Sequence, residues 1–339
     1  MRVEDVYFSG VGLHIPPAMP AEEAVAAGLT DERNVRRTRM RSVCVADESG
    51  PEMAVKAARE ALRTARAAPA DIDLVLHAST YFQGHDLWAP ASYVQRESIG
   101  NTCPSMDVSN LSNGCMAALE LAVSYLRAEP ARHSALITTG DRFSPPGFDR
   151  WATDPGTVTG DGGTAAVISK AGGFARIRSL VTVSDPTLEK MGRGDDPFAT
   201  LPLANRSPIS VEENRARLVR EIGMAELIDR LHSGQQEAYE RALKDADVSA
   251  GDIDWSVVPH LGRPKMEFQF FGALGIDPER TTWNWGAGVG HLGAGDQFAG
   301  LAHLRRTGAL EEGGHVALIS AGGGFAWSVA VLEVCDLVR

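Results

Sequence analysis

The chain has 339 residues, of which 44% are hydrophobic and 23% are charged, as in ordinary soluble globular proteins. Its 33 Lys and Arg and 44 Asp and Glu give a formal net charge of −11, which argues against broad nucleic-acid binding. No stretch approaches the ~18 consecutive apolar residues of a membrane span, and residues 1–5 carry acids where a secretory signal would be apolar. The 4 cysteines lack paired spacing. We therefore expect a cytoplasmic protein that binds neither nucleic acid nor membranes.

The first predicted elements are a helix, a turn and a strand. Residues 53–66 place alanines and Leu62 at helical spacing, and Pro69 and Asp71 mark a turn. Residues 72–76 form an apolar run that is short enough for a buried strand. Helices that alternate with buried strands indicate an α/β protein with a largely parallel sheet.

The sequence also contains an internal repeat. Residues 61–73 (ALRTARAAPADID) recur as residues 242–254 (ALKDADVSAGDID), and residues 133–143 (HSALITTGDRF) recur as residues 315–325 (HVALISAGGGF). The two segments are separated by nearly the same length of chain in both halves, which indicates a duplication. We expect two domains, residues 1–170 and 171–339, with a more polar linker around residues 187–230.

Cys115 is the first candidate for chemistry. Residues 107–115 (DVSNLSNGC) lead into a helix predicted over residues 116–126, where apolar side chains follow helical spacing. A cysteine at a helix N-terminus meets unpaired backbone N–H groups and the positive end of the helix dipole, and both favour the reactive thiolate. Cys115 is therefore a candidate nucleophile. The alternative is a small buried core cysteine, which is the commoner state of a free cysteine.

The candidate partners of Cys115 come from the second half. His260 follows an apolar run that ends at residue 258, at the strand end where α/β sheets build their sites. His291 and Asp296 lie in a glycine-rich turn that enters the next predicted helix, and the repeat makes Asp296 the counterpart of Cys115. We expect the nucleophile and these side chains to face each other between the halves.

Two other kinds of site are not favoured. Residues 288–293 read GxGxxG, but no predicted strand precedes them, and Glu311 and Glu312, about 20 residues further on, lie in a glycine-rich turn instead of ending a second strand, so a nucleotide site is not expected. His291 and Asp296 do not lie on one helix face, and no cluster has zinc spacing, so no metal site is expected either.

Taken together, these segments resemble the thiolase superfamily, and most closely β-ketoacyl-acyl-carrier-protein synthase III (KAS III). The resemblance covers nearly the whole chain and rests on residues 10–16, 107–126, 160–167 (GDGGTAAV), 259–260 and 322–327 (GGGFAW). It implies the thiolase fold, a duplicated five-layered α-β-α-β-α architecture with two mixed sheets. It also implies that Cys115 takes up the acyl group, that His260 is the family's histidine, and that the N–H groups of Cys115 and Gly323 form the oxyanion hole. KAS III-like proteins pair through their first halves, so we expect a homodimer.

The sequence also departs from KAS III. Gly290-His291 stands where KAS III carries Gly-Asn, and His260-Leu261-Gly262-Arg263 replaces the family's His-Gln-Ala-Asn. Arg33 stands where many KAS III enzymes carry the tryptophan that stacks on the CoA adenine, and the turn before Cys115 is two or three residues longer than usual. The chain is similar to a branch of KAS III-like proteins in polyketide antibiotic pathways. Members of this branch transfer acyl groups to hydroxyls, and they include malonyl transferases that act on sugars.

The resemblance therefore implies an acyltransferase. Cys115 would take an acyl group from a CoA or carrier-protein thioester, and His291 or His260, oriented by Asp296, would activate the hydroxyl of a secondary-metabolite acceptor. One alternative is a KAS III enzyme that condenses a starter acyl unit with malonyl-carrier protein. Another is a ketosynthase-like subunit that only binds a partner.

The thioester donor has a predicted binding surface. Five arginines lie at positions 33, 36, 37, 39 and 41, at the place where the family binds CoA, and arginine suits bidentate phosphate contacts. We expect Arg33, Arg37 and Arg263 to meet the phosphates of CoA or of a phosphopantetheine carrier, with no tightly bound cofactor. The alternative is a solvated basic face without a specific role.

Overall fold

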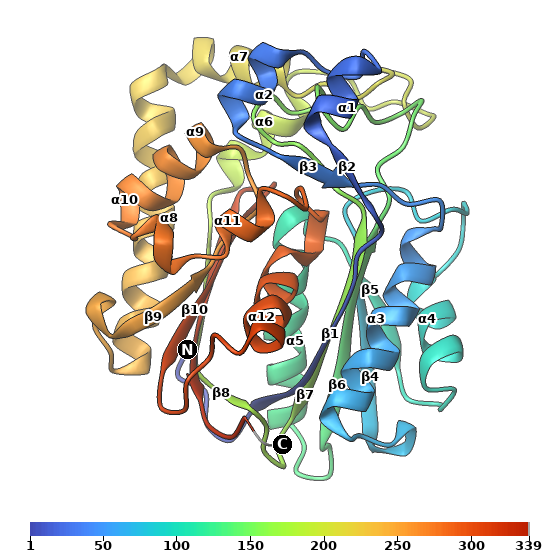
Figure 1. Ribbon diagram of the computed structural model, residues 1–339, viewed down its shortest axis with the longest axis vertical. Helices are drawn as coiled ribbons and strands as arrows, with labels where there is room; N and C mark the ends of the chain where they lie inside the picture. The colour runs from blue at the N-terminus through green and yellow to red at the C-terminus, as the bar shows by residue number, and fades with distance from the viewer. Residues whose placement is uncertain (338–339) are drawn as a thin grey trace.

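The computed structural model in Figure 1 describes residues 1–337. Its strands are β1 (Tyr7–His14), β2 (Ala18–Pro20), β3 (Ser42–Cys44), β4 (Ile72–Ala78), β5 (Ser105–Val108), β6 (Ser134–Asp141), β7 (Gly162–Ser169), β8 (Ala175–Ser184), β9 (Ile253–Val257), β10 (His315–Gly322) and β11 (Ala326–Val334). Its helices are α1 (Ala21–Ala26), α2 (Glu32–Thr38), α3 (Gly50–Ala65), α4 (Pro90–Ser98), α5 (Gly114–Arg127), α6 (Lys190–Arg193), α7 (Glu212–Ile222), α8 (Met224–Ala246), α9 (Arg263–Met266), α10 (Gly272–Leu274), α11 (Trp283–Gly286) and α12 (Asp296–Thr307).

Hydrogen bonds link the main strands of residues 1–337 in the order β5-β4-β6-β7-β1-β8-β11-β10-β9. β1 and β8 share only two residue pairs, Tyr7 with Arg176 and Phe8 with Ala175, so this short junction divides the array into two sheets. Both sheets are mixed. β4 runs parallel to β5 and β6, β9 runs parallel to β10, and the other neighbours are antiparallel.

The central helices α5 and α12 lie between the two sheets (Figure 1). Helices α3 and α4 cover the outer face of the first sheet, and α8 covers the outer face of the second (Figure 1). β6 and β7 are buried at every residue, as expected of strands that have helices on both faces. The predicted α-β-α-β-α order with two mixed sheets is confirmed.

The internal repeat forms corresponding elements in the two halves. In each half a long helix, α3 or α8, ends in a 3₁₀ turn that leads into a strand, β4 or β9. The second repeated segment forms β6 in the first half and β10 in the second. Helices α5 and α12 occupy corresponding places and contact each other in the centre of the molecule. Their N-terminal ends therefore bring together side chains that are far apart in the sequence.

The polar segment between the halves forms short helices. It contains α6 and α7, and α8 begins at Met224, inside the predicted linker. Across the residues that the structure describes, no helix combines the length and apolar character that crossing a membrane requires.

Candidate active site

A strained turn presents Ser112 ahead of α5. The 3₁₀ turn Leu111–Asn113 leads directly into α5, and Leu111 has a φ of 45°. Non-glycine residues rarely adopt this left-handed conformation, which costs about 1–3 kcal/mol, so surrounding contacts must hold the turn. Gly114 permits one of them, because a Cβ added there would lie 2.9 Å from the Cβ of Ala294. The turn leaves Ser112 partly exposed.

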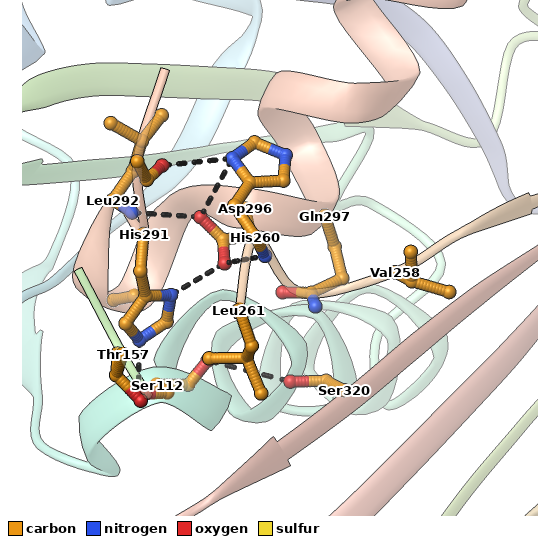
Figure 2. Close-up of polar contacts among 12 residues, drawn as sticks. Ser112, Thr157, Val258, His260, Leu261, His291, Leu292, Asp296, Gln297 and Ser320 are labelled. Atoms are coloured by element: carbon orange, nitrogen blue, oxygen red, sulfur yellow. Dashed lines mark hydrogen bonds and ion pairs between the residues drawn. The ribbon is translucent and has the colours of Figure 1, made fainter. Parts of the chain in front are cut away.

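Ser112, His291 and Asp296 form a hydrogen-bonded chain across the junction of the halves (Figure 2). Ser112 Oγ lies 2.8 Å from His291 Nε2, and His291 Nδ1 lies 2.5 Å from Asp296 Oδ2. A hydroxyl, an imidazole and a carboxylate in this order are the parts of an activated serine nucleophile, because the imidazole takes the hydroxyl proton and the carboxylate fixes the imidazole tautomer. The sequence predicts that His291 and Asp296 lie together, whereas Ser112 was not among the predicted site residues.

The charges at the site suit this arrangement. Burial alone would lower the pKa of His291, but the charge of Asp296 and the hydrogen bond to it raise that pKa above its ordinary value of 6.5. Burial also opposes ionisation of Asp296, yet the charges of His260 and His291 outweigh it and lower the pKa of Asp296 to about 2. Asp296 is therefore a carboxylate at neutral pH. It accepts from Nδ1–H of His291, which leaves Nε2 to take the proton of Ser112.

His260, the second predicted histidine, also contacts Asp296. Asp296 Oδ2 accepts from the backbone N–H of His260 at 2.8 Å, and Oδ1 lies 3.3 Å from its Nδ1. Nδ1 also donates to the carbonyl of Gly290 at 3.0 Å. The ring lies on the side of Asp296 away from Ser112 (Figure 2) and packs edge-on against Trp285. The geometry makes His260 a support for Asp296, whereas the resemblance placed it at the acyl group.

Cys115 lies in the buried contact between α5 and α12. Its side chain is 0% exposed, and its Sγ donates to Gln297 Oε1 at 3.4 Å. Burial, together with the charge of Asp296, raises the pKa of the thiol to about 12. Desolvation therefore outweighs the helix N-terminus, and the thiol stays protonated at neutral pH. These observations oppose Cys115 as the nucleophile and describe instead the buried core cysteine, the alternative considered for it.

The sequence held a signal for Ser112. The turn before Cys115 is two or three residues longer than in the family, so the family's nucleophile position would fall two or three residues before Cys115. Ser112 stands three residues before Cys115. Cys115 is the more conspicuous candidate in the sequence, because the nucleophile of the family is a cysteine.

Hydrogen bonds between polar side chains fix the turn that carries Ser112. Asn113 Nδ2 donates to Asn110 Oδ1 at 3.0 Å and to Ser328 Oγ at 2.9 Å. Ser328 Oγ lies 2.9 Å from Thr182 Oγ1, which donates to Glu120 Oε2 at 2.6 Å. Asn113 and Ser328 are buried. The turn is thereby tied to strands β8 and β11 and to the body of α5.

The end of β10 lies against the same turn. A Cβ added at Gly322 would lie 2.6 Å from the backbone nitrogen of Asn113, and one at Gly323 would lie 2.4 Å from Leu111 Cδ1. Gly323, the predicted oxyanion donor, is thus placed beside the turn that carries Ser112. Its partner in the prediction, the N–H of Cys115, lies deeper in the helix.

A buried carboxylate holds the turn that carries His291 and Asp296. Asp141 is 0% exposed and accepts from the backbone N–H groups of Thr80 and Tyr81 at 2.8 Å each and of Ala294 at 3.3 Å. Burial raises the pKa of Asp141 to about 7, although these hydrogen bonds oppose the shift.

The predicted donor-binding arginines differ in their surroundings. Arg33 and Arg37 are exposed on α2, and Arg37 donates to Asn34 Oδ1 at 3.0 Å. Arg263 is tied down: it donates to Glu267 at 2.7 Å, and its guanidinium lies over the rings of Phe271 and Trp283. The structure therefore leaves Arg33 and Arg37 available to a ligand and engages Arg263 in the protein itself.

Comparisons with known proteins agree with this architecture. The family profile described as 3-oxoacyl-[acyl-carrier-protein (ACP)] synthase III matches residues 106–186, and the profile of its C-terminal domain matches residues 243–334. A solved structure named ChlB3, an acyltransferase, is 33% identical, with a TM-score of 0.93 and 98% of each chain covered. The protein belongs to the 3-oxoacyl-[acyl-carrier-protein] synthase III family.

Two further relatives share less sequence identity with this chain. The β-ketoacyl-[acyl-carrier-protein] synthase III of Sphingopyxis alaskensis is 29% identical over 316 residues, which cover 93% of this chain and 94% of that protein. The structure of 3-oxoacyl-[acyl-carrier-protein] synthase III from Aquifex aeolicus is 20% identical, with a TM-score of 0.78, and covers 97% of this chain and 99% of that one. Within residues 1–337 no group of three or more His, Cys, Asp or Glu side chains is arranged to hold a metal ion.

Proposed function

We propose that the protein is an acyltransferase that carries the acyl group on Ser112 and passes it from a CoA or carrier-protein thioester to the hydroxyl of a small-molecule acceptor. The observation that carries the proposal is the chain from Ser112 Oγ through His291 to Asp296. The likeness to ChlB3, named as an acyltransferase, supports it. The acyl-cysteine mechanism expected from the sequence is replaced by an acyl-serine mechanism, because the Cys115 thiol is buried and protonated.

In the first half of the proposed reaction, His291 Nε2 takes the proton of Ser112 Oγ as the oxygen attacks the thioester carbonyl. The backbone N–H groups of Ser112 and Gly323 would hold the negative oxygen of the tetrahedral intermediate. The carbon–sulfur bond then breaks, the thiolate of the donor takes the proton from His291, and an ester of Ser112 remains.

In the second half, His291 Nε2 takes a proton from the acceptor hydroxyl, and the hydroxyl oxygen attacks the ester carbonyl. The bond to Ser112 Oγ breaks, and the proton returns to that oxygen. Asp296 stabilises the imidazolium formed in both halves and does not itself take the proton. His291 thus serves as base and then as acid in each half.

Condensation is the second candidate, favoured by the names of the relatives that align over nearly the whole chain. Malonyl-CoA, incubated with the purified protein and an acyl-carrier protein or a panel of alcohols, separates the two reactions. Condensation releases carbon dioxide, whereas ester formation retains the carboxylate. We expect ester formation because His291, a titrating base, stands where condensing members of the family carry asparagine.

The acyl-serine intermediate is tested by intact-mass measurement after incubation with a panel of acyl-CoA thioesters. We expect one acyl group on the wild-type chain and on the Cys115→Ala variant, none on Ser112→Ala, and the modified peptide to contain Ser112. Acylation that persists in Ser112→Ala and disappears in Cys115→Ala would restore the cysteine mechanism.

The remaining parts of the proposal concern partners and setting. The exposed Arg33 and Arg37 of α2 would contact the phosphate of the donor. We further propose a homodimer that pairs through β5, an edge strand of the sheet, beside which Leu87, Trp88 and Met106 are exposed. Malonyl transfer within cytoplasmic polyketide antibiotic biosynthesis is the setting that the sequence resemblance suggests.

A further inference from the structure

We propose that the protein also accepts oxygen esters as acyl donors, and so exchanges acyl groups between hydroxyl compounds without a thioester. The proposal rests on the proposed function in one respect, namely that Ser112 is the nucleophile. Its substrates are carboxylic esters of alcohols or phenols, with a second alcohol as acceptor. Such an exchange does not follow from membership of a family whose nucleophile is a cysteine.

The free energy of the acyl-enzyme intermediate differs between a serine and a cysteine nucleophile. A thioester is a stronger acyl donor than an oxygen ester, because sulfur conjugates weakly with the carbonyl. A cysteine nucleophile would keep that donor strength until the second half of the reaction. Ser112 Oγ, placed 2.8 Å from the imidazole of His291, converts the thioester into an oxygen ester in the first half. The second half then exchanges one oxygen ester for another, so its equilibrium constant lies near one and it runs in both directions.

The leaving group of an oxygen ester requires an acid in the site. An alkoxide is a much poorer leaving group than a thiolate and must receive a proton as the carbon–oxygen bond breaks. The imidazolium of His291 supplies that proton, and it is stabilised by the Asp296 carboxylate 2.5 Å from Nδ1. The elevated pKa of His291 agrees with this role. The site therefore already contains the acid that an ester donor requires.

The same atoms serve both directions of the exchange. When an ester R–CO–OR′ reacts with Ser112, His291 takes the hydroxyl proton, the bond from the carbonyl carbon to OR′ breaks, and R′OH leaves with that proton. A second alcohol R″OH then takes the acyl group from Ser112 by the reverse sequence. Atoms and charges balance with no further reactant. The buried, protonated thiol of Cys115 offers no competing route.

The experiment compares matched donors. The acyl-CoA that loads the wild-type protein best, chosen from acetyl-, butyryl-, benzoyl- and malonyl-CoA, is paired with the benzyl ester of the same acyl group. Acylation is followed by intact mass and peptide mapping, and exchange is followed by transfer of the acyl group from the benzyl ester to deuterated benzyl alcohol. We expect both donors to place the acyl group on Ser112 and exchange to require no CoA.

Two variants make the test specific. Ser112→Cys is expected to load from the acyl-CoA but to lose loading from the benzyl ester by about 10²-fold or more, because a thioester would have to form from an oxygen ester. Cys103→Ser removes a partly exposed thiol outside the site and should behave as the wild type.

The outcomes are distinguishable. Wild-type protein that loads from acyl-CoA at Ser112 but never from the ester would overturn the ester exchange and leave the proposed function standing. Ester exchange that continues in Ser112→Ala would also overturn it, because the acyl group would then not pass through Ser112. A chain that no thioester and no ester acylates at Ser112 would remove the proposed function, and the exchange with it.

Discussion

Asn113 Nδ2 donates to Ser328 Oγ at 2.9 Å, so the residue that follows Ser112 is fixed to the opposite sheet. Glu120, at the other end of this chain of hydrogen bonds, determines which group donates at each step. The single hydroxyl proton of Thr182 goes to the Glu120 carboxylate, so Ser328 must donate to Thr182 Oγ1 and accept from Asn113. The amide of Asn113 is held in one orientation, and with it the turn in which Leu111 has a φ of 45°.

We therefore expect Thr182→Val to slow acylation of Ser112 although Thr182 touches no substrate. The valine removes the acceptor of the Ser328 proton, and a buried donor left without a partner costs about 1–3 kcal/mol. We predict about a 10-fold lower kcat with little change in KM, and a matching loss in the rate at which a fluorophosphonate labels Ser112. Thr182→Ser keeps the hydroxyl and should restore both rates. Equal rates in Thr182→Val and the wild type would show that the hydrogen bond between Ser328 and Thr182 is not needed to hold the turn.

The pH dependence of acylation follows from His291. The base must be neutral to take the proton of Ser112, and the pKa of His291 is raised above 6.5 chiefly by Asp296, against the effect of burial. Acylation should therefore rise with pH along a limb whose midpoint lies above 6.5. Asp296→Asn should lower the midpoint, because the main charge that opposes the effect of burial is then lost, and reduce the plateau rate by about 10²–10⁴-fold. Acylation rates measured from pH 5 to 9 with a saturating acyl-CoA test the midpoint and the plateau rate. An unchanged midpoint in Asp296→Asn would contradict the role of His291 as the base.

Asp141 should make stability fall as pH rises. Burial raises its pKa in the folded protein from 3.8 to about 7, so between these values the folded state binds a proton that the unfolded chain has released. The stability linked to Asp141 is present below about pH 4 and is lost as pH rises through 7. Asp141→Asn removes this dependence, so its urea midpoint should lie further below that of the wild type at pH 4.5 than at pH 8. A gap that widens at pH 8 would mean that Asp141 is ionised in the folded protein throughout.

The sequence was sufficient for features that depend on pattern. The repeat predicted the two corresponding halves, and the glycine-rich turn placed His291 beside Asp296, because both rest on residues close in the sequence. The nucleophile that we propose depends on a geometry that no sequence pattern shows. Ser112 is presented by a left-handed residue, Leu111, and Cys115, three positions later, is directed into the helix contact.

The direction of the His260 ring was equally inaccessible from sequence. The position of His260 at a strand end was correct, since β9 ends at Val257. Which way its ring points depends on Asp296, on the carbonyl of Gly290 and on the space left by Gly286. Those contacts join segments that the sequence does not relate to one another.

The space at Gly286 gives the last prediction. A Cβ added there would lie 2.3 Å from Cδ2 and 2.6 Å from Cγ of His260, so Gly286→Ala must displace the ring. The displaced ring loses its contact with Asp296, 3.3 Å from Nδ1, and the carboxylate that orients His291 is held less firmly. We expect kcat to fall by about 10-fold with KM nearly unchanged, which corresponds to about 1.4 kcal/mol of lost transition-state stabilisation.

Overpacking alone destabilises by about 1–3 kcal/mol, so the matched control is Gly234→Ala. Its Cβ would lie 2.3 Å from the ring of Trp327, in the contact between α8 and β11, and side chains alternate along a strand, so this ring lies on the face of β11 opposite to Ser328. We expect both variants to lower the melting temperature and only Gly286→Ala to lower kcat, measured at a temperature where both remain folded. If the two variants reduce kcat equally, the effect is one of stability, and His260 does not act through Asp296. If only Gly286→Ala is slow, and the midpoint of its pH dependence of acylation also shifts to lower pH, then the loss of the His260 contact changes how Asp296 acts on His291. This result is expected because both histidines contact the same carboxylate.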